Sequence, residues 1–252
     1  MKSIIRTMMI LTLVSVFAMG ISTSAYLIAI PTSLSNVQSK LQKNGFRILG
    51  THHNVITITN KELQNTNTYT ATLQVYVGSS GIRIQNPEYF GAAYLDHRYK
   101  QGYFQVTMTA LIKVFGNLKG SQERLNSNEL SNYRFMPGMP QFKQFISVCK
   151  TEKVQRKIQG NKNILYTLPL PNGTILVGHR LSTGTNGFLR KLGQTKNSQI
   201  LPYEVLIYSN EVKMMHPKFY LALSLPQLSM DQFMKIADIP DKIERDIRNA
   251  YK

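Results

Sequence analysis

The chain has 252 residues, of which 42% are apolar and 17% charged, and its formal net charge is +17. These values exclude a disordered chain and predict one large or two small globular domains. Residues 31–200 carry 21 Lys and Arg against 6 Asp and Glu, whereas residues 201–252 carry 7 of each kind. Because no run of five basic residues occurs, the pattern argues against a nucleic-acid-binding protein. The single cysteine, Cys149, excludes an intramolecular disulfide.

Residues 1–25 have the three parts of a secretory signal peptide. A basic start with Lys2 and Arg6 is followed by an apolar run over residues 8–21 and by small residues that end at Ala25. As a helix, that run would span about 21 Å, less than the roughly 30 Å hydrocarbon core of a bilayer. We therefore expect a periplasmic or secreted protein whose signal peptide is cleaved near Ala25. The alternative is an uncleaved N-terminal membrane anchor that continues beyond Ala25.

Residues 31–117 are predicted to form a first α+β half. Apolar spacing and turn residues indicate a helix that begins at Ser33 or Ser35 and ends at Asn44-Gly45. Alternating β-branched and aromatic residues indicate strands, and the turn over residues 78–81 indicates a hairpin. The predicted strands are 46–49, 55–59, 69–77 and 82–84, and the later helices are 88–95 and 104–115.

Residues 118–139 are polar and without clear periodicity, so we predict a linker, and residues 140–252 form the second α+β half. Pro140 is predicted to open a helix that buries Cys149 on its apolar face. Asn172-Gly173 predicts a hairpin turn. The predicted strands of this half are 163–168, 174–179, 200–208 and 212–215, and its later helices begin near Phe188, at the Ser229 and Gln232 capping box and at Pro240.

Two segments in the two halves share one pattern. Asn86-Pro87-Glu88-Tyr89-Phe90 and His216-Pro217-Lys218-Phe219-Tyr220 each place a polar residue, a proline, a charged residue and two aromatics after a predicted hairpin. Proline ends a strand ladder because it lacks the amide hydrogen and has a fixed φ. The shared pattern predicts an internal duplication and two similar halves.

Residues 201–208 (LPYEVLIY), followed by Val212 and Pro217, resemble the closing hairpin of the domain-of-unknown-function family numbered 302. The step Asn44-Gly45-Phe46 and the step over residues 86–89 are similar to other parts of that domain. The resemblance covers about half of the chain after the leader. It implies an α+β domain with one helix layer on an antiparallel sheet. It implies no catalytic residue, because the family has no settled chemistry.

The histidines and one loop are the candidates for chemistry. In a regular strand His52 and His53 would point to opposite faces, so they could not share a metal. His97 or His179 could assist catalysis in an enzyme. The loop over residues 182–187, which precedes Arg190, has backbone amides that could hold an anion. The alternative for this loop is an ordinary strand-to-helix connection.

We therefore predict an α+β fold of antiparallel hairpins packed against helices, and a non-enzymatic ligand-binding or accessory module. Its ligand site is predicted near Tyr89, His179, Arg190 and His216, and no catalytic residue, metal or cofactor is assigned. The expected partner is an unknown small ligand or an envelope protein, or an anionic membrane surface attracted by the basic charge. The alternatives are an envelope enzyme with a histidine-assisted site and a basic interaction protein of the envelope surface.

Overall fold

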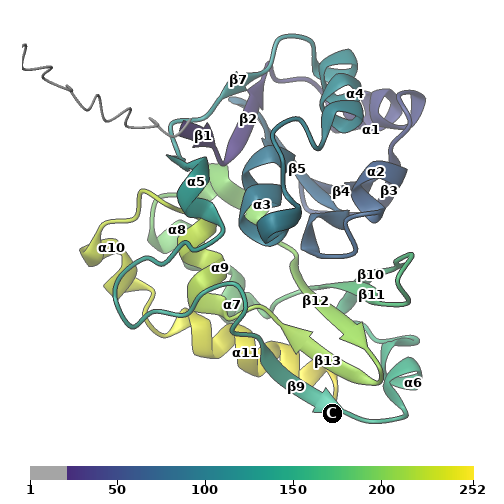
Figure 1. The fold of residues 1–252 in the computed structure, drawn as a ribbon, viewed down its shortest axis with the longest axis vertical. Coiled ribbons are helices and arrows are strands. Elements are labelled where there is room, and N and C mark those ends of the chain that lie inside the picture. Colours follow the sequence, from purple (N-terminus) through teal and green to yellow (C-terminus); the bar gives the residue numbers. More distant parts are fainter. Residues whose placement is uncertain (1–21) are drawn as a thin grey trace, which may run out of the picture.

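Antiparallel hairpins backed by helices make up residues 22–252, the part of the chain that the computed structural model describes (Figure 1). The predicted α+β class is confirmed. The strands are β1 (Ser22–Ser24), β2 (Tyr26–Ala29), β3 (Arg47–His52), β4 (Val55–Thr59), β5 (Leu73–Gly78), β6 (Gly81–Gln85), β7 (Lys119–Gly120), β8 (Arg124–Asn126), β9 (Ile146–Lys150), β10 (Ile164–Pro169), β11 (Ile175–His179), β12 (Tyr203–Tyr208) and β13 (Glu211–Met214). The helices are α1 (Leu34–Lys43), α2 (Lys61–Gln64), α3 (Pro87–Tyr94), α4 (Gln105–Phe115), α5 (Ser127–Leu130), α6 (Val154–Ile158), α7 (Thr183–Asn186), α8 (Phe188–Lys191), α9 (Pro217–Ser224), α10 (Met230–Lys235) and α11 (Ile239–Ala250), with 3-10 turns η1 (Tyr69–Ala71), η2 (Asp96–Arg98) and η3 (Thr195–Ile200).

The two large sheets have the same topology. The strand order is β3-β4-β5-β6-β2-β7 in one sheet and β10-β11-β12-β13-β9 in the other, and all neighbouring strands are antiparallel. Apart from β7, each strand of the first sheet has a counterpart at the same place in the second. We call residues 26–115 the N-terminal half and residues 146–252 the C-terminal half. The prediction of two similar halves is confirmed at the level of topology.

The equivalence extends to single residues in the first hairpin of each half. Ile48-Leu49-Gly50-Thr51 on β3 corresponds to Ile164-Leu165-Tyr166-Thr167 on β10, with three of four residues identical. In both strands the register shifts at the same step, before the third residue of this segment. An irregularity conserved between the halves indicates that they share a backbone design, and not only a strand order.

The repeated proline segments begin equivalent helices. The Asn86 side chain accepts a hydrogen bond from the Glu88 amide (3.1 Å) and caps α3. In the C-terminal half, His216 Nδ1 accepts from the Lys218 amide (3.2 Å) and caps α9. Each proline occupies the first helical turn, where its missing amide hydrogen leaves no bond unmade.

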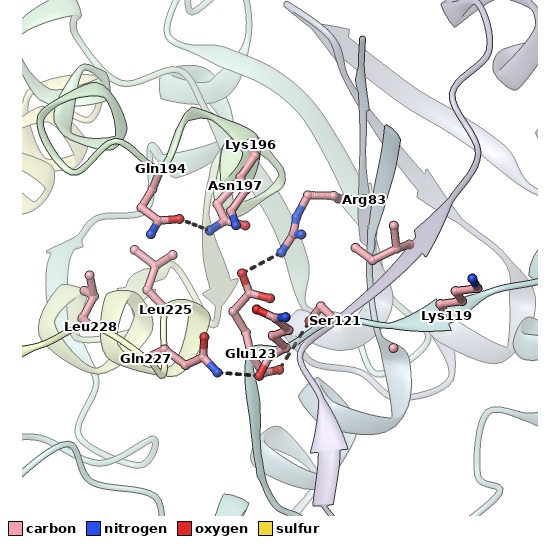
Figure 2. A pocket seen from close by; sticks show the side chains of 13 residues that line it. Arg83, Lys119, Ser121, Glu123, Gln194, Lys196, Asn197, Leu225, Gln227 and Leu228 are labelled. Carbon is pink, nitrogen blue, oxygen red and sulfur yellow. Dashed lines mark hydrogen bonds and ion pairs between the residues drawn. The ribbon is translucent and has the colours of Figure 1, made fainter. Parts of the chain in front are cut away.

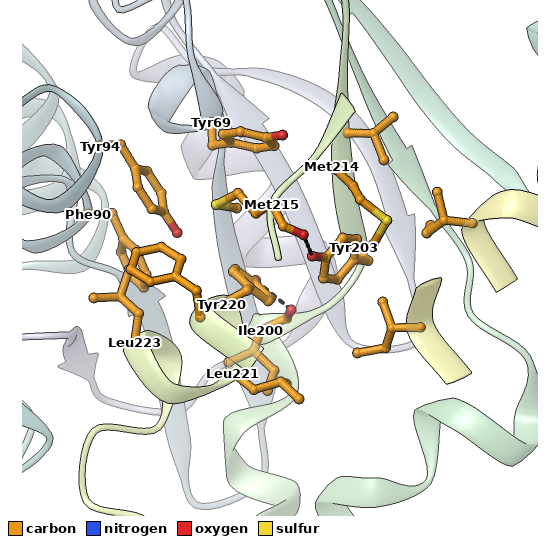
Figure 3. Packing of buried hydrophobic residues seen from close by; sticks show 14 of the residues in the cluster. Tyr69, Phe90, Tyr94, Ile200, Tyr203, Met214, Met215, Tyr220, Leu221 and Leu223 are labelled. Carbon is orange, nitrogen blue, oxygen red and sulfur yellow. Dashed lines mark hydrogen bonds between the residues drawn. The ribbon is translucent and has the colours of Figure 1, made fainter. Parts of the chain in front are cut away.

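Two hydrophobic clusters form the core. One lies wholly in the N-terminal half, where Val37 of α1 and Leu111 of α4 pack on the six-stranded sheet. The other contains side chains of both halves. Figure 3 shows Tyr94 of α3 in the same cluster as Met215 and Tyr220 from the C-terminal half. The halves are therefore joined by this shared cluster, which we call the shared core.

Buried tyrosines join the halves by hydrogen bonds as well as by packing. Tyr26 Oη donates to the Ser224 carbonyl (2.6 Å), and Tyr89 Oη donates to the Leu223 carbonyl (2.8 Å). Both tyrosines have no exposed surface. Buried tyrosine hydroxyls need such partners, because an unpaired polar group in the core is unfavourable.

The segment predicted as a linker, residues 118–139, packs against the rest of the fold. Its strand β7 pairs with β2, and its strand β8 pairs with β1. Leu130 of α5 is fully buried in the shared core. Low periodicity here reflects short elements that are stabilised by distant partners, and not a solvated connection.

The prediction of a helix from Pro140 through Cys149 is wrong. Ile146–Lys150 is strand β9, which pairs with β13. Cys149 is partly exposed, whereas Val148 is the buried residue of the strand. A short apolar run fits both periods, and its pairing with a strand some sixty residues away is not visible locally.

Residues 1–21 of the predicted signal peptide lie outside the described residues. Its predicted end, Ser22–Ala25, belongs to the fold: Ser22–Ser24 form strand β1, and Ala25 is a buried bend before β2. No helix within residues 22–252 combines the length and the apolar composition needed to cross a membrane.

Candidate functional site

A cavity of about 340 Å³ opens where the β3–β4 turn of the N-terminal half meets the connection from β11 to β12 in the C-terminal half. We call it the junction cavity. Its size falls in the range of small-molecule sites. It is lined by His52, His53, Asn54, Val55, Tyr76, His179, Arg180, Leu181, Asn186, Gly187, Leu189, Arg190, Thr195, Ser198, Leu201 and Pro202.

The cavity exists on one side of the molecule because the two halves differ in one connection. Between the paired ends of their second and third strands, the N-terminal half has residues 59–72 and the C-terminal half has residues 180–202, nine residues more. Residues of this longer connection supply much of the cavity lining. At the equivalent place in the other half, the Asn172 amide donates directly to Asn67 Oδ1 (2.9 Å).

The charged side chains that line the junction cavity are all basic. Arg180 and Arg190 are exposed, and neither makes an ion pair within residues 22–252. No aspartate or glutamate is among the lining residues, whereas Val55, Leu189 and others supply apolar surface. Guanidinium groups beside apolar walls suit a ligand with an acidic group and a hydrocarbon part.

His52 and His53 lie side by side at the rim. Their ring centroids are 4.2 Å apart, because His53 leaves the strand with a φ of 52°. The prediction that they point to opposite faces is therefore wrong, since it assumed a regular strand. Burial, followed by the nearby His53 and Arg180, lowers the pKa of His52. Among residues 22–252, no group of three or more His, Cys, Asp or Glu is arranged to hold a metal ion.

Of the four predicted ligand-binding residues, the structure brings His179 and Arg190 to the junction cavity. The His179 side chain is fully buried, and burial lowers its pKa to about 4. Its ring lies 5.4 Å from the Tyr251 ring, and Nδ1 is 3.2 Å from the Val177 carbonyl oxygen. At neutral pH the ring is uncharged, so His179 contributes shape to the cavity wall and the arginines contribute charge.

The other two predicted residues lie away from the cavity and have structural roles. Tyr89 is buried in the shared core, and His216 is the cap of α9. His97, the second histidine considered for catalysis, is an exposed residue of η2 beside Asp96. Arg180, which the prediction did not include, follows His179 directly and was identifiable as a cation at the end of a predicted strand.

The loop over residues 182–187 does hold a carboxylate, but one from the same chain. The Ser182 amide donates to Asp246 Oδ2 of α11 (2.8 Å). The loop continues as the short helix α7, which is the ordinary strand-to-helix connection. Its role is therefore to fix the long connection against α11, while Asn186 and Gly187 face the cavity.

A second cavity of about 330 Å³ also lies between the halves, and Figure 2 shows its lining. Its central feature is an ion pair between Arg83 and Glu123 (3.0 Å). Burial alone would raise the pKa of Glu123, but Arg83 and nearby hydrogen-bond donors lower it overall. Glu123 therefore compensates Arg83, and the other charged residues of this lining are Lys119 and Lys196.

The two sheets also meet at a polar cluster centred on Glu204. Tyr166 Oη donates to Glu204 Oε1 (2.5 Å), Thr72 Oγ1 donates to the same oxygen, and Gln74 Nε2 lies 3.4 Å from it. Gln74 and Glu204 occupy equivalent positions on β5 and β12. Burial raises the pKa of Glu204 to about 7, although hydrogen bonds from Thr72 and Tyr166 act in the opposite direction. The residue keeps some exposed surface.

No model of a protein family, no curated protein and no solved structure matches this chain. The resemblance of residues 201–208 to family 302 therefore stays a prediction.

Proposed function

We propose that this protein is an exported, non-enzymatic binding protein whose junction cavity takes a small organic anion. The observation that carries the proposal is the set of lining residues. Two arginines and three histidines line the cavity, and no acidic side chain is among its lining residues. Export rests on the leader pattern of residues 1–25.

The cavity favours binding over catalysis because of the state of its histidines. Acid–base catalysis needs a group whose pKa lies near the working pH and which can reach a substrate proton. His179 is buried with a pKa near 4, and its Nδ1 already faces a backbone carbonyl. The arginines, by contrast, are permanently charged and exposed.

The apolar part of the lining narrows the class of ligand. Val55, Leu181, Leu189 and Leu201 supply surface that a fully hydrated inorganic ion would not use. A carboxylate or phosphate group on a hydrocarbon frame would engage the arginines and cover this surface at once. The ligand is therefore an organic anion, and not inorganic phosphate or sulfate.

Calorimetric titration with benzoate and with benzamide tests the proposal, because the two probes share a shape and differ in charge. Benzoate should bind in the millimolar range or tighter, about −4 kcal/mol or better, and benzamide at least about fivefold more weakly. Equal affinities would refute charge recognition. No binding by benzoate, hexanoate and phenyl phosphate would refute the proposal as a whole.

Matched variants locate the binding. Arg190→Gln and Arg180→Gln should each weaken benzoate binding by about fivefold, which corresponds to about 1 kcal/mol for an exposed charge-assisted contact. Arg245→Gln is the control, since Arg245 is an exposed arginine of α11 outside the cavity. An equal effect at Arg245 would mean that benzoate responds only to net charge. Release of the protein from anionic vesicles by salt would indicate a surface role instead.

A further inference from the structure

The short segment Ser22–Tyr26 is part of the folded protein. Strand β1 pairs with β8 at all three of its positions, from Ser22 opposite Asn126 to Ser24 opposite Arg124. Ala25 and Tyr26 have no exposed surface. Ser24 is buried as well, so the buried part of the chain begins two residues before strand β2.

Hydrogen bonds hold the same segment from several sides. Asn86 Nδ2 donates to the Ser24 carbonyl (2.8 Å), and Ser24 Oγ donates to the Ser121 carbonyl (2.9 Å). The Ala25 amide donates to the Glu123 carbonyl (2.7 Å), and the Ala25 carbonyl accepts from the Asn86 amide (3.0 Å). Removal of Ser22–Ala25 would remove all four of these hydrogen bonds, and the loss of buried hydrogen bonds is unfavourable.

A chain that began at Tyr26 would also place its terminal ammonium in the core. The Tyr26 backbone nitrogen donates to Ser121 Oγ (3.3 Å), and the whole residue is buried. An ammonium at this point would lose its hydration, and the nearby Glu123 carboxylate is already paired with Arg83. The predicted cleavage after Ala25 therefore conflicts with the fold.

We propose that the leader is removed on the N-terminal side of Ser22, at the Gly20–Ile21 bond. The proposal rests on the export proposed above. Ala18-Met19-Gly20 places small residues three and one positions before this bond, which is the spacing that a signal peptidase recognises. Water is added across the Gly20–Ile21 peptide bond, which leaves a carboxylate on Gly20 and an ammonium on Ile21. All the bonds of Ser22–Tyr26 are kept.

Expression of the full chain in a bacterial host, followed by intact mass and N-terminal sequencing of each cell fraction, tests the site. The exported protein should begin at Ile21, and a start at Ser22 or earlier keeps β1 whole and supports the structural argument. A start anywhere from Thr23 to Tyr26 overturns it. Uncleaved chain in the membrane overturns processing and supports an anchor, whereas uncleaved chain in the cytosol overturns export as well.

Two variants separate the competing bonds. Gly20→Lys places a large charge immediately before the proposed bond and should cause uncleaved precursor to accumulate. Thr23→Lys is the matched control, since it makes the same change at the position that cleavage after Ala25 would need to be small. It should leave processing unchanged. The opposite pattern, with Thr23→Lys blocking and Gly20→Lys silent, would overturn the proposal.

A stability measurement tests the structural step without export. Two chains are produced in the cytosol, each with an initiator methionine. One begins at Ser22 and the other at Tyr26, so they differ only in Ser22–Ala25. The shorter chain should melt at least about 5 °C lower or fail to fold. Equal melting temperatures would show that Ser22–Ala25 are dispensable and would remove the basis of the proposal.

Discussion

The N-terminal and C-terminal halves share a topology but differ in the chemistry of their interiors. Where β4 carries Ile58, the equivalent position on β11 carries His179, and where β5 carries Gln74, β12 carries Glu204. The N-terminal half thus has uncharged residues at both positions, and the C-terminal half has ionisable ones. The nine extra residues and the cavity arginines also belong to the C-terminal half.

This comparison shows that a repeated backbone can keep its strand order while one copy gains ionisable interior residues and a longer connection. Hydrophobic contacts and strand pairing maintain the topology in both halves. Single residues and one connection then give the C-terminal half its ionisable interior residues and its cavity wall. Replacing a residue of the C-terminal half by its counterpart in the N-terminal half should therefore remove the corresponding feature alone.

The largest expected change is a loss of stability at Gly178, where β11 lies close to the Tyr166 side chain of β10. A Cβ atom added to Gly178 would lie 2.3 Å from the Tyr166 ring, so Gly178→Ala should destabilise the protein by about 3 kcal/mol in denaturant unfolding. Gly50→Ala is the control in the N-terminal half, because its Cβ would meet nothing closer than 3.5 Å. If Tyr166→Gly fails to make Gly178→Ala tolerable, the clash is not the cause.

The next effect concerns His179. Burial lowers the pKa of His179 to about 4 from an ordinary 6.5. The buried neutral ring therefore contributes fully to the free energy of unfolding above pH 6.5, and this contribution is lost as the pH falls toward 4. At pH 5 the loss is about 2 kcal/mol. His179→Ile, which copies Ile58, should remove this acid-dependent loss between pH 7 and 5 in urea unfolding. Parallel stability curves for the two proteins would contradict the assignment.

Glu204 should make the protein less stable as the pH rises, which is opposite to the effect of His179 and smaller. Burial raises the pKa of Glu204 to about 7 from 4.5. Its contribution to the free energy of unfolding is therefore complete below pH 4.5 and is lost as the pH rises through 7. Glu204→Gln copies Gln74 and stays uncharged at both pH values. The stability of this variant relative to wild type should therefore increase by about 1 kcal/mol from pH 5 to pH 8, a value reduced by the partial exposure of Glu204. Melting curves at both pH values measure the gain. An unchanged pH dependence would exclude Glu204 as the titrating group.

The smallest effect is expected in binding. The lowered pKa of His52 leaves its ring neutral at pH 8, and protonation at lower pH adds a positive charge beside the arginines. Because the pKa is lowered, protonation at pH 6 is incomplete, and benzoate affinity should rise by at most about twofold from pH 8 to 6 in calorimetry, with one site per chain. His52→Gln should weaken this dependence. A second site would contradict the difference between the halves, since the equivalent junction is closed by Asn67 and Asn172.

Local signals were sufficient to predict most hairpins and helix ends. Asn172-Gly173 marks a true turn, and Ser229 with Gln232 forms the predicted capping box. These features depend on residues a few positions apart. The shared proline pattern was also informative, because a cap and a proline define the start of a helix by themselves.

Features that depend on distant partners were not predictable. Ile146–Lys150 becomes a strand because β13 offers it an edge, and the segment around Leu130 is ordered by a core that it helps to close. The junction cavity needs the β3–β4 turn beside a connection more than a hundred residues later. Sequence analysis found His179 and Arg190, but it could not separate them from Tyr89 and His216, whose roles are set by packing.

The bond from Tyr26 to Ser224 has a consequence for the order of assembly. The residue at the start of the first large-sheet strand reaches its hydroxyl acceptor only after nearly two hundred further residues have been made. A growing chain can therefore form the N-terminal helix-and-sheet layer early, but it cannot close the common interior until its last quarter has emerged. Such late closure slows folding, because the loop entropy is lost before the contacts form.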